Sequence, residues 1–159
     1  YEYGEERYAP AIAAAIVRRR EAAPIHTTLE LVDVIRSAMP PAALREKQHP
    51  AKRSFQAIRI AVNSELDALN EGLDAIFNCL APGGRLCVIT FHSLEDRLVK
   101  NKFRRWAQRC TCPPEQPVCT CGGVAKAKLI TRKPIEADAA ELEANRRSRS
   151  AKLRVLEKV

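Results

Sequence analysis

The chain has 159 residues, of which 46% are hydrophobic and 29% charged, and this composition excludes a disordered or fibrous protein. No stretch approaches the ~20 apolar residues that a membrane-spanning helix needs, so we expect a cytoplasmic protein without membrane contact. The net charge of +8 favours a polyanionic partner such as nucleic acid, although a merely well-solvated basic surface would give the same excess.

Two helices are predicted near the beginning of the chain. Apolar residues at helical spacing predict the first from about residue 5 to residue 21, and Pro24 closes that segment. Thr27 and Glu30 have the spacing of a capping box, in which each side chain satisfies an unpaired amide at the start of a second helix. The Pro40-Pro41 pair is predicted to stop this helix.

The strongest periodic pattern follows His49-Pro50 and ends near Leu80, with apolar residues recurring every three or four positions. Proline is favoured at the first position of a helix, so the run is predicted to be helical from its beginning. Asn63-Ser64 could cap a new helix, and the pattern therefore allows one long helix or two that meet near residue 63.

A β-strand and a capped helix are predicted next. Residues 85–91 form a short apolar run without alternation, which is typical of a strand buried on both faces of a parallel sheet. Ser93-Leu94-Glu95-Asp96 has the pattern of a second capping box, and it predicts a basic helix that continues to about Gln108. A strand followed by a capped helix is the repeating unit of an α/β fold.

Two further strands are predicted at residues 127–130 and 151–159, where they would pair like a hairpin at the edge of the sheet. The second is preceded by the basic segment 146–149, which includes Arg147 and Arg149. These arginines could bind phosphate, or they could solvate an edge strand and discourage edge pairing.

The end of the strand at 85–91 is the first candidate site, because ligands of open α/β sheets bind beyond the carboxyl ends of strands. His92 and Ser93 occupy that position. His92 could accept a proton or stack on a base, and the amides after Ser93 could receive an anion. In the purely structural alternative, Ser93 and Asp96 cap the helix and His92 covers its start.

The segment that follows His49 is the second candidate site. Its polar side chains Lys52, Arg53, Gln56 and Arg59 share one helical face, while Phe55 and Ile58 are expected to point inward. This cationic face could position a phosphate backbone, or it could be an ordinary solvated surface.

Four cysteines crowd into twelve residues: Cys110, Cys112, Cys119 and Cys121. A hairpin could bring their thiolates around a zinc ion, although one residue between paired cysteines is fewer than the usual two. Free thiols and disulfides remain as alternatives, and without a secretory signal disulfides are not the default.

Four segments, in this order, resemble the MraW family of small-subunit ribosomal RNA methyltransferases. They are Tyr3-Gly4-Glu5-Glu6-Arg7-Tyr8-Ala9, the segment from His49 to Ile60, Thr90-Phe91-His92-Ser93-Leu94-Glu95-Asp96-Arg97, and Arg147-Ser148-Arg149-Ser150-Ala151-Lys152-Leu153-Arg154. The resemblance covers essentially the whole chain and corresponds to the C-terminal half of a family member.

The resemblance implies an α/β fold in which this chain is the C-terminal half of a Rossmann-like methyltransferase sheet with a helical substrate-recognition insertion. Residues 1–62 would be most of that insertion, and residues 63–159 the returning half of the catalytic domain, with a Cys-rich loop at 110–123. The glycine-rich loop that binds the donor would lie upstream of Tyr1, so the fragment alone is expected to be inactive. Because a half-sheet exposes apolar faces, the fragment is also expected either to self-associate or to have poor stability.

The implied activity is S-adenosylmethionine-dependent N4-methylation of a cytidine in 16S rRNA of the small ribosomal subunit. On this interpretation His92 and Ser93 face the active-site cleft. The expected RNA-binding residues are His49, Lys52, Arg53, Arg59, Arg147 and Arg149. The alternative from a different class is a nonenzymatic basic RNA-binding module with a structural zinc held by the four cysteines.

Overall fold

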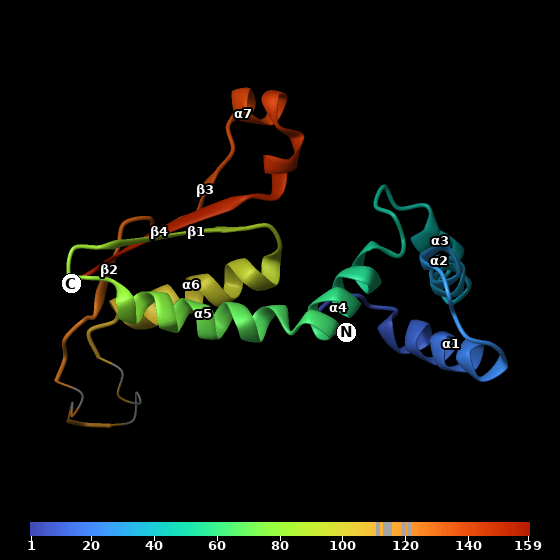
Figure 1. The fold of residues 1–159 in the computed structure, drawn as a ribbon, viewed down its shortest axis with the longest axis horizontal. Coiled ribbons are helices and arrows are strands. Elements are labelled where there is room, and N and C mark those ends of the chain that lie inside the picture. Colours follow the sequence, from blue (N-terminus) through green and yellow to red (C-terminus); the bar gives the residue numbers. More distant parts are fainter. Residues whose placement is uncertain (111, 113–115, 119, 121) are drawn as a thin grey trace. The chain divides into compact units, whose positions relative to one another are not determined.

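The computed structural model describes residues 1–110, 112, 116–118, 120 and 122–159. The chain divides into two compact units, Tyr1–Glu65 and Leu66–Val159. Figure 1 shows the first unit as helical and the second as a small sheet with helices. The assignment of these units to a substrate-recognition insertion and a catalytic domain stays a prediction.

The first unit consists of four helices and their connections: α1 (Ala9–Ala22), α2 (Thr28–Ser37), α3 (Pro41–Leu44) and α4 (Lys52–Asn63). The helix predicted from residue 5 begins four residues later, because the preceding residues form turns. The predicted cap of α2 is confirmed, since the Thr27 hydroxyl accepts a hydrogen bond from the Glu30 amide at 3.2 Å. The Pro40-Pro41 pair ends α2 as predicted, and Pro41 also opens the short α3.

Ile12, Ile35 and Ala51 form the buried core of this unit, and Phe55 is among the partly buried side chains that pack on it. Ile35 is completely buried. The prediction that Ile58 also points inward is wrong, because its side chain is 39% exposed and Ile60 occupies the buried position instead.

Gly4 allows the N-terminal turn to pack closely on α4. A Cβ atom at this position would lie 2.6 Å from the carbonyl oxygen of Arg53, which is too close for any other residue. The Gln56 amide donates a hydrogen bond to the Tyr3 carbonyl at 3.2 Å and holds the same turn. The first family-like segment therefore has a structural reason for its glycine.

The long periodic run after residue 50 is two helices, because Ser64 has the left-handed φ of 50° and ends α4. The next helix is α5 (Glu65–Cys79). The second unit continues with β1 (Arg85–Thr90), α6 (Ser93–Ala107), β2 (Ala127–Leu129), β3 (Ile135–Glu136), α7 (Ala139–Ala144), a 3-10 helix (Arg146–Ser150) and β4 (Lys152–Lys158).

The strands of this unit form an antiparallel sheet in the order β1-β4-β2, with β3 also pairing with β4. Two predictions fail here. The 151–159 segment is not an edge strand, because β4 lies between β1 and β2. The predicted parallel pairing of the 85–91 strand is also absent from the described residues, where β1 pairs antiparallel with β4.

One face of the sheet packs on α5 and α6 and forms the core of the second unit. The core residues are Leu73, Phe77, Leu86, Val99, Phe103, Ala127 and Leu156. On the opposite face of β1, Cys87 is exposed and Ile89 is 59% exposed. The prediction that this strand is buried on both faces is therefore wrong for the described part of the chain.

Candidate functional site

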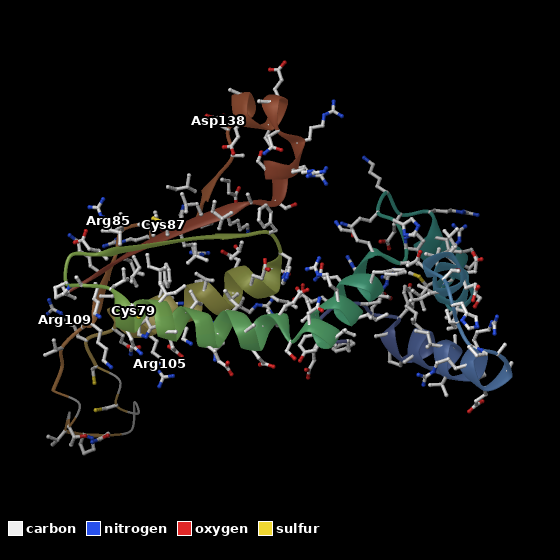
Figure 2. All side chains as sticks on the ribbon, viewed as in Figure 1. Cys79, Arg85, Cys87, Arg105, Arg109 and Asp138 are labelled. Atoms are coloured by element: carbon white, nitrogen blue, oxygen red, sulfur yellow. The ribbon has the colours of Figure 1, made fainter. Side chains whose placement is uncertain are left out.

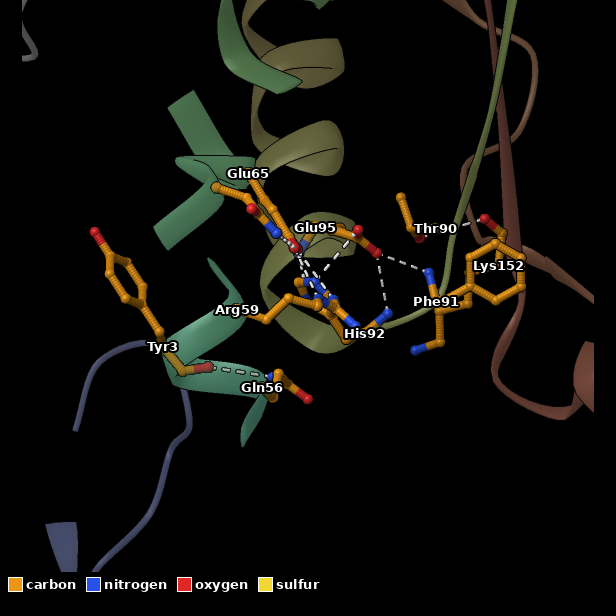
Figure 3. A network of polar contacts seen from close by, with 10 residues as sticks. Tyr3, Gln56, Arg59, Glu65, Thr90, Phe91, His92, Glu95 and Lys152 are labelled. Carbon is orange, nitrogen blue, oxygen red and sulfur yellow. Dashed lines mark hydrogen bonds and ion pairs between the residues drawn. The ribbon is translucent and has the colours of Figure 1, made fainter. Parts of the chain in front are cut away.

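The junction between β1 and α6 carries His92 and Ser93. His92, rather than Ser93, is the N-cap of α6, because its Nδ1 atom accepts a hydrogen bond from the Glu95 amide at 3.3 Å. The Glu95 carboxylate in turn accepts hydrogen bonds from the amides of Phe91 and His92 at 2.9 and 3.2 Å (Figure 3). The predicted capping box is therefore present but begins one residue earlier.

This cap restricts the chemistry available to His92. Because Nδ1 is an acceptor, the neutral imidazole carries its proton on Nε2. Nε2 is buried without a hydrogen-bond partner among the described residues, although it lies 3.3 Å from the Glu95 Oε1 atom. At this distance the carboxylate can interact electrostatically with the Nε2–H group. The ring is thus oriented by the cap, and only 12% of its side chain is exposed.

Glu95 occupies the position at this helix N-terminus where an anion was expected to bind. Its carboxylate occupies the amides of Phe91 and His92, and Asp96 places a second acidic group in the first turn. Acidic side chains at this position complement the helix dipole. The negative charge that the helix start favours is therefore supplied by the chain itself.

A buried ion pair fastens α6 to β4 behind this junction. The Arg154 guanidinium donates two hydrogen bonds to the Asp96 carboxylate at 2.7 and 3.0 Å. The Arg154 and Asp96 side chains are 8% and 13% exposed. The hydrogen bond from Arg154 lowers the pKa of the Asp96 carboxyl, and this effect outweighs the opposing effect of burial. Sequence analysis missed the pair, because 58 residues separate its members.

The antiparallel register brings the basic C-terminal segment to the same end of the sheet. Thr90, the last residue of β1, pairs with Lys152, the first residue of β4, and its hydroxyl donates to the Lys152 carbonyl at 3.4 Å. The 3-10 helix that carries Arg147 and Arg149 directly precedes β4, and both arginines are exposed. Two family-like segments that are far apart in the sequence therefore meet at one sheet end.

The predicted RNA-binding residues of the first unit lie on or just before α4. Lys52 and Arg53 are exposed at the start of the helix, and His49 is exposed with its Nδ1 atom accepting from the Ala51 amide at 3.3 Å. Arg59 is held differently, because its guanidinium donates to both oxygens of Glu65 at 2.7 and 3.0 Å. A phosphate at Arg59 would have to compete with this carboxylate.

The predicted zinc ligands lie only partly within the described residues. Cys119 and Cys121 are outside them, and Cys110 and Cys112 are partly buried. The Cys112 sulfur lies 3.9 Å from the Thr120 hydroxyl. The tetrahedral arrangement of four thiolates therefore stays a prediction.

The described residues do not form a cradle for S-adenosylmethionine. No glycine lies in the junction between β1 and α6. The glycines lie elsewhere: Gly4 against α4, Gly72 within α5, Gly83 and Gly84 in the turn before β1, and Gly122 and Gly123 beyond α6. The acidic group nearest the strand end, Glu95, is already engaged by backbone amides.

The fold and this junction define a mixed α/β protein with polar side chains gathered at the carboxyl end of a strand. The model of the MraW methylase family matches residues 1–159, and the chain belongs to that family.

Relatives named "Ribosomal RNA small subunit methyltransferase H" are similar to this chain over its whole length. Those from Symbiobacterium thermophilum and Heliobacterium mobile are each 60% identical, over 158 and 159 residues. The relative from Geobacter sp. strain M21 is also 60% identical, over 158 residues. The chain spans about half the length of these relatives. Among the described residues, no helix is both long and apolar enough to cross a membrane.

Proposed function

We propose that this chain is the C-terminal half of an S-adenosylmethionine-dependent enzyme that methylates N4 of a cytidine in 16S rRNA. The observation that carries the proposal is the family match across all 159 residues, together with 60% identity to relatives named as small-subunit rRNA methyltransferases. On this proposal the first unit recognises the RNA and the second completes the catalytic domain.

The reaction depends mainly on how the cytosine amine is positioned relative to the methyl group. The exocyclic amine of cytosine is a poor nucleophile because its lone pair is delocalised into the ring, so the base must leave its stack and be held in line with the methyl group. S-Adenosylmethionine supplies that methyl group when it is bound by the upstream half. As the bond from N4 to the methyl carbon forms, the bond from that carbon to sulfur breaks and a neutral thioether leaves. The amine then gives its extra proton to water.

His92 is the side chain of this half that we place beside the flipped cytidine. The cap fixes its ring, since Nδ1 receives the Glu95 amide and Nε2 lies near the Glu95 carboxylate. An imidazole held in this way can pack against a base, but it cannot accept a proton at Nδ1 without losing the cap. We therefore assign His92 a positioning role and Ser93 the adjacent wall of the cleft.

A pair of substitutions separates this role from simple capping. Asparagine is a good N-cap residue and alanine is not, so His92→Asn preserves the helix start and His92→Ala does not. In a polypeptide extended upstream, both variants should lose methylation, but only His92→Ala should lower the unfolding midpoint. Normal turnover by His92→Asn would remove the proposed role beside the cytidine.

The basic residues of both units would hold the RNA backbone. His49, Lys52, Arg53 and Arg59 lie in the first unit, and Arg147 and Arg149 lie at the sheet end of the second. Contacts to phosphate orient a nucleic acid without reading its sequence. The natural setting of this RNA on our proposal is the small ribosomal subunit in the cytoplasm.

The exposed face of the sheet supports self-association of the chain when it is alone. Ile89 and Ile135 are 59% and 54% exposed, and the register places Ile89 and Ile135 on either side of Leu153. Ile89→Thr should shift the chain toward monomer in analytical ultracentrifugation, whereas Val62→Thr, at a 77% exposed position on α4, should not. A monomeric chain before substitution would contradict this part of the proposal.

The product assay tests the proposed reaction itself. A polypeptide extended upstream is incubated with labelled S-adenosylmethionine and unmethylated small subunits, and the RNA is digested to nucleosides. We expect label in N4-methylcytidine. Label in C5-methylcytidine or on a ribose hydroxyl would overturn the assigned chemistry.

The alternative of a nonenzymatic RNA-binding module rests on the lack of a donor cradle among the described residues. It predicts RNA binding without donor binding even after upstream extension, and about one zinc per chain if the cysteines hold a metal. Calorimetric titration with S-adenosylmethionine and metal analysis of the purified chain distinguish the two functions.

A further inference from the structure

A polar groove runs between α5 and α6 in the second unit, away from the strand end described above. Its volume is about 730 Å³. The lining residues are Asn70 and Asp74 of α5, Leu98, Asn101, Lys102, Arg105 and Trp106 of α6, and Gln108, Arg109, Val124 and Lys126 beyond it. Small-molecule pockets of this size are mostly apolar, and this groove is not.

One wall of the groove is fixed by a cation that is already neutralised. The Lys102 ammonium donates to the Asn70 carbonyl, the Asn70 side-chain oxygen and the Asp74 carboxylate, each at 2.6 Å. The same ammonium lies 5.9 Å from the centre of the Trp106 ring, which stacks on Phe77 at 4.1 Å. These contacts hold this wall of the groove in place.

The other cations of the groove have no such partner. Arg105, Arg109 and Lys126 are exposed, and within the described part of the chain none of their side chains makes an ion pair or hydrogen bond. Figure 2 labels Arg105 and Arg109 at the same end of the unit. Four cations and one carboxylate leave the groove with a net charge of +3.

The backbone around these cations is held in place. The Lys126 amide donates to the Trp106 carbonyl at 2.9 Å, and the Val159 amide donates to the Lys126 carbonyl at 3.1 Å. Lys126 is therefore tied both to the end of α6 and to the end of the chain. These bonds fix the backbone at Lys126, while the exposed side chains of the groove stay available to a phosphate.

We propose that the groove lined by Arg105, Arg109 and Lys126 binds the phosphodiester backbone of the RNA substrate. The proposal rests on the proposed function for the identity of the RNA, and it adds a contact surface to the basic residues already assigned to RNA binding. Because the proposed acceptors are phosphate oxygens, which are the same at every nucleotide, the contact positions RNA and does not read its sequence.

Salt dependence is the most direct signature of such a surface. Each phosphate contact contributes about 0.7 to 0.9 to the slope of log K against log salt. Arg105→Ala combined with Arg109→Ala should therefore make that slope less steep by about 1.5, and should weaken binding at low salt on the order of tenfold. The readout is fluorescence anisotropy of a labelled small-subunit rRNA fragment with the 159-residue chain.

The matched control removes two cations of the second unit that do not line the groove. Lys128 and Lys133 are exposed and, among the described residues, have no ion pair or hydrogen bond through their side chains. Lys128→Ala combined with Lys133→Ala changes the net charge equally, so a general charge effect would weaken both double variants alike. Equal slopes for the two would overturn the groove proposal.

A second pair of variants removes negative charge instead of positive charge. Asp74→Asn removes the carboxylate from the groove while Lys102 keeps its two contacts to Asn70, so RNA should bind several-fold more tightly. Glu71→Gln removes an exposed carboxylate of α5 that does not line the groove. If both variants tighten binding equally, the groove has no special role.

The outcome for the groove is separable from that for the proposed function. If the unsubstituted chain binds RNA and its upstream-extended form makes N4-methylcytidine, yet the arginine variants match their control, only the groove proposal fails. If the unsubstituted chain binds no RNA in any salt, the groove proposal is overturned. A lack of N4-methylcytidine from the extended form with intact, groove-dependent RNA binding would overturn the proposed reaction and leave the groove standing.

Discussion

The two units of this chain are built from different kinds of interaction. In Tyr1–Glu65 the helices follow local signals, such as the Thr27 cap, and pack around the small cluster of Ile12, Ile35 and Ala51. In Leu66–Val159 the sheet depends on partners that are distant in sequence, such as Arg85 with Glu157 and Asp96 with Arg154. The stability of the first unit should therefore respond to local changes, and that of the second unit to the loss of single long-range contacts.

The chain offers a separate optical probe for each unit. Its one tryptophan, Trp106, lies in the second unit, and its three tyrosines, Tyr1, Tyr3 and Tyr8, lie in the first. Trp106 is stacked on Phe77, so its fluorescence should change when that core unfolds. Unfolding of the two units can therefore be followed in one urea titration.

The largest effect is expected for Asp96→Asn. This substitution leaves the buried Arg154 without its counter-ion, and the loss of one member of a buried pair costs about 3 to 5 kcal/mol. The midpoint followed by Trp106 should fall accordingly. Arg85→Ala is the control, since its pair with Glu157 has 62% of the arginine side chain exposed and should contribute at most about 1 kcal/mol. An equal loss in the free energy of unfolding for the two variants would contradict the special importance of the buried pair.

The same pair predicts a dependence on pH. The pKa of Asp96 is lowered by its hydrogen bond from Arg154, so its contribution to stability is complete above the ordinary pKa of about 3.9 and is lost as pH falls through the lowered value. The Trp106 midpoint of the unsubstituted chain should therefore fall below about pH 4 more steeply than that of Asp96→Asn. If the midpoints of the two proteins fell in parallel with pH, the lowered pKa of Asp96 would not contribute to folding stability.

A core substitution in each unit tests whether the two units unfold independently. Ile35→Ala empties a fully buried position of the first unit, and large-to-small changes of this kind cost about 2 to 5 kcal/mol. Its effect should be seen in the tyrosine signal, while Val99→Ala should act on the Trp106 signal. If either substitution moved both midpoints together, the units would unfold as one.

A smaller effect is expected for Thr27→Ala, which removes the hydrogen bond to the Glu30 amide. Loss of such a cap costs about 1 kcal/mol. Thr28→Ala, at the first residue of α2 and exposed, is the matched control and should change the tyrosine midpoint much less. Hydrogen exchange of the Glu30 amide provides a second, local measurement.

The sequence predicted most of the helices, because their signals lie within a few residues of one another. It placed a capping box at the start of α6 but chose Ser93, since histidine is not a usual N-cap residue. Periodicity allowed either one or two helices after residue 50, and the left-handed backbone at Ser64 resolves that choice. These differences are local, and each has a local cause.

The strand order of the sheet and the groove between α5 and α6 could not be predicted from local sequence signals. An apolar run such as 85–91 does not specify whether a neighbouring strand is parallel, and nothing near Arg154 indicates that Asp96 neutralises it. The basic residues of α6 were visible in the sequence, but their concave setting depends on α5 and on the segment at Lys126. The position of His92 beside the strand end was better indicated, because this residue directly follows the predicted strand 85–91.

The proposed division of labour between this chain and the upstream half of its relatives is tested most directly by a chimera. The upstream half of the Symbiobacterium thermophilum relative is joined to this chain, which is 60% identical to the part that it replaces. Labelled S-adenosylmethionine and unmethylated small subunits are then supplied to the chimera and to this chain alone. We expect N4-methylcytidine from the chimera and none from the chain alone. Product from the chain alone, or an inactive chimera beside an active complete relative, would contradict the claim.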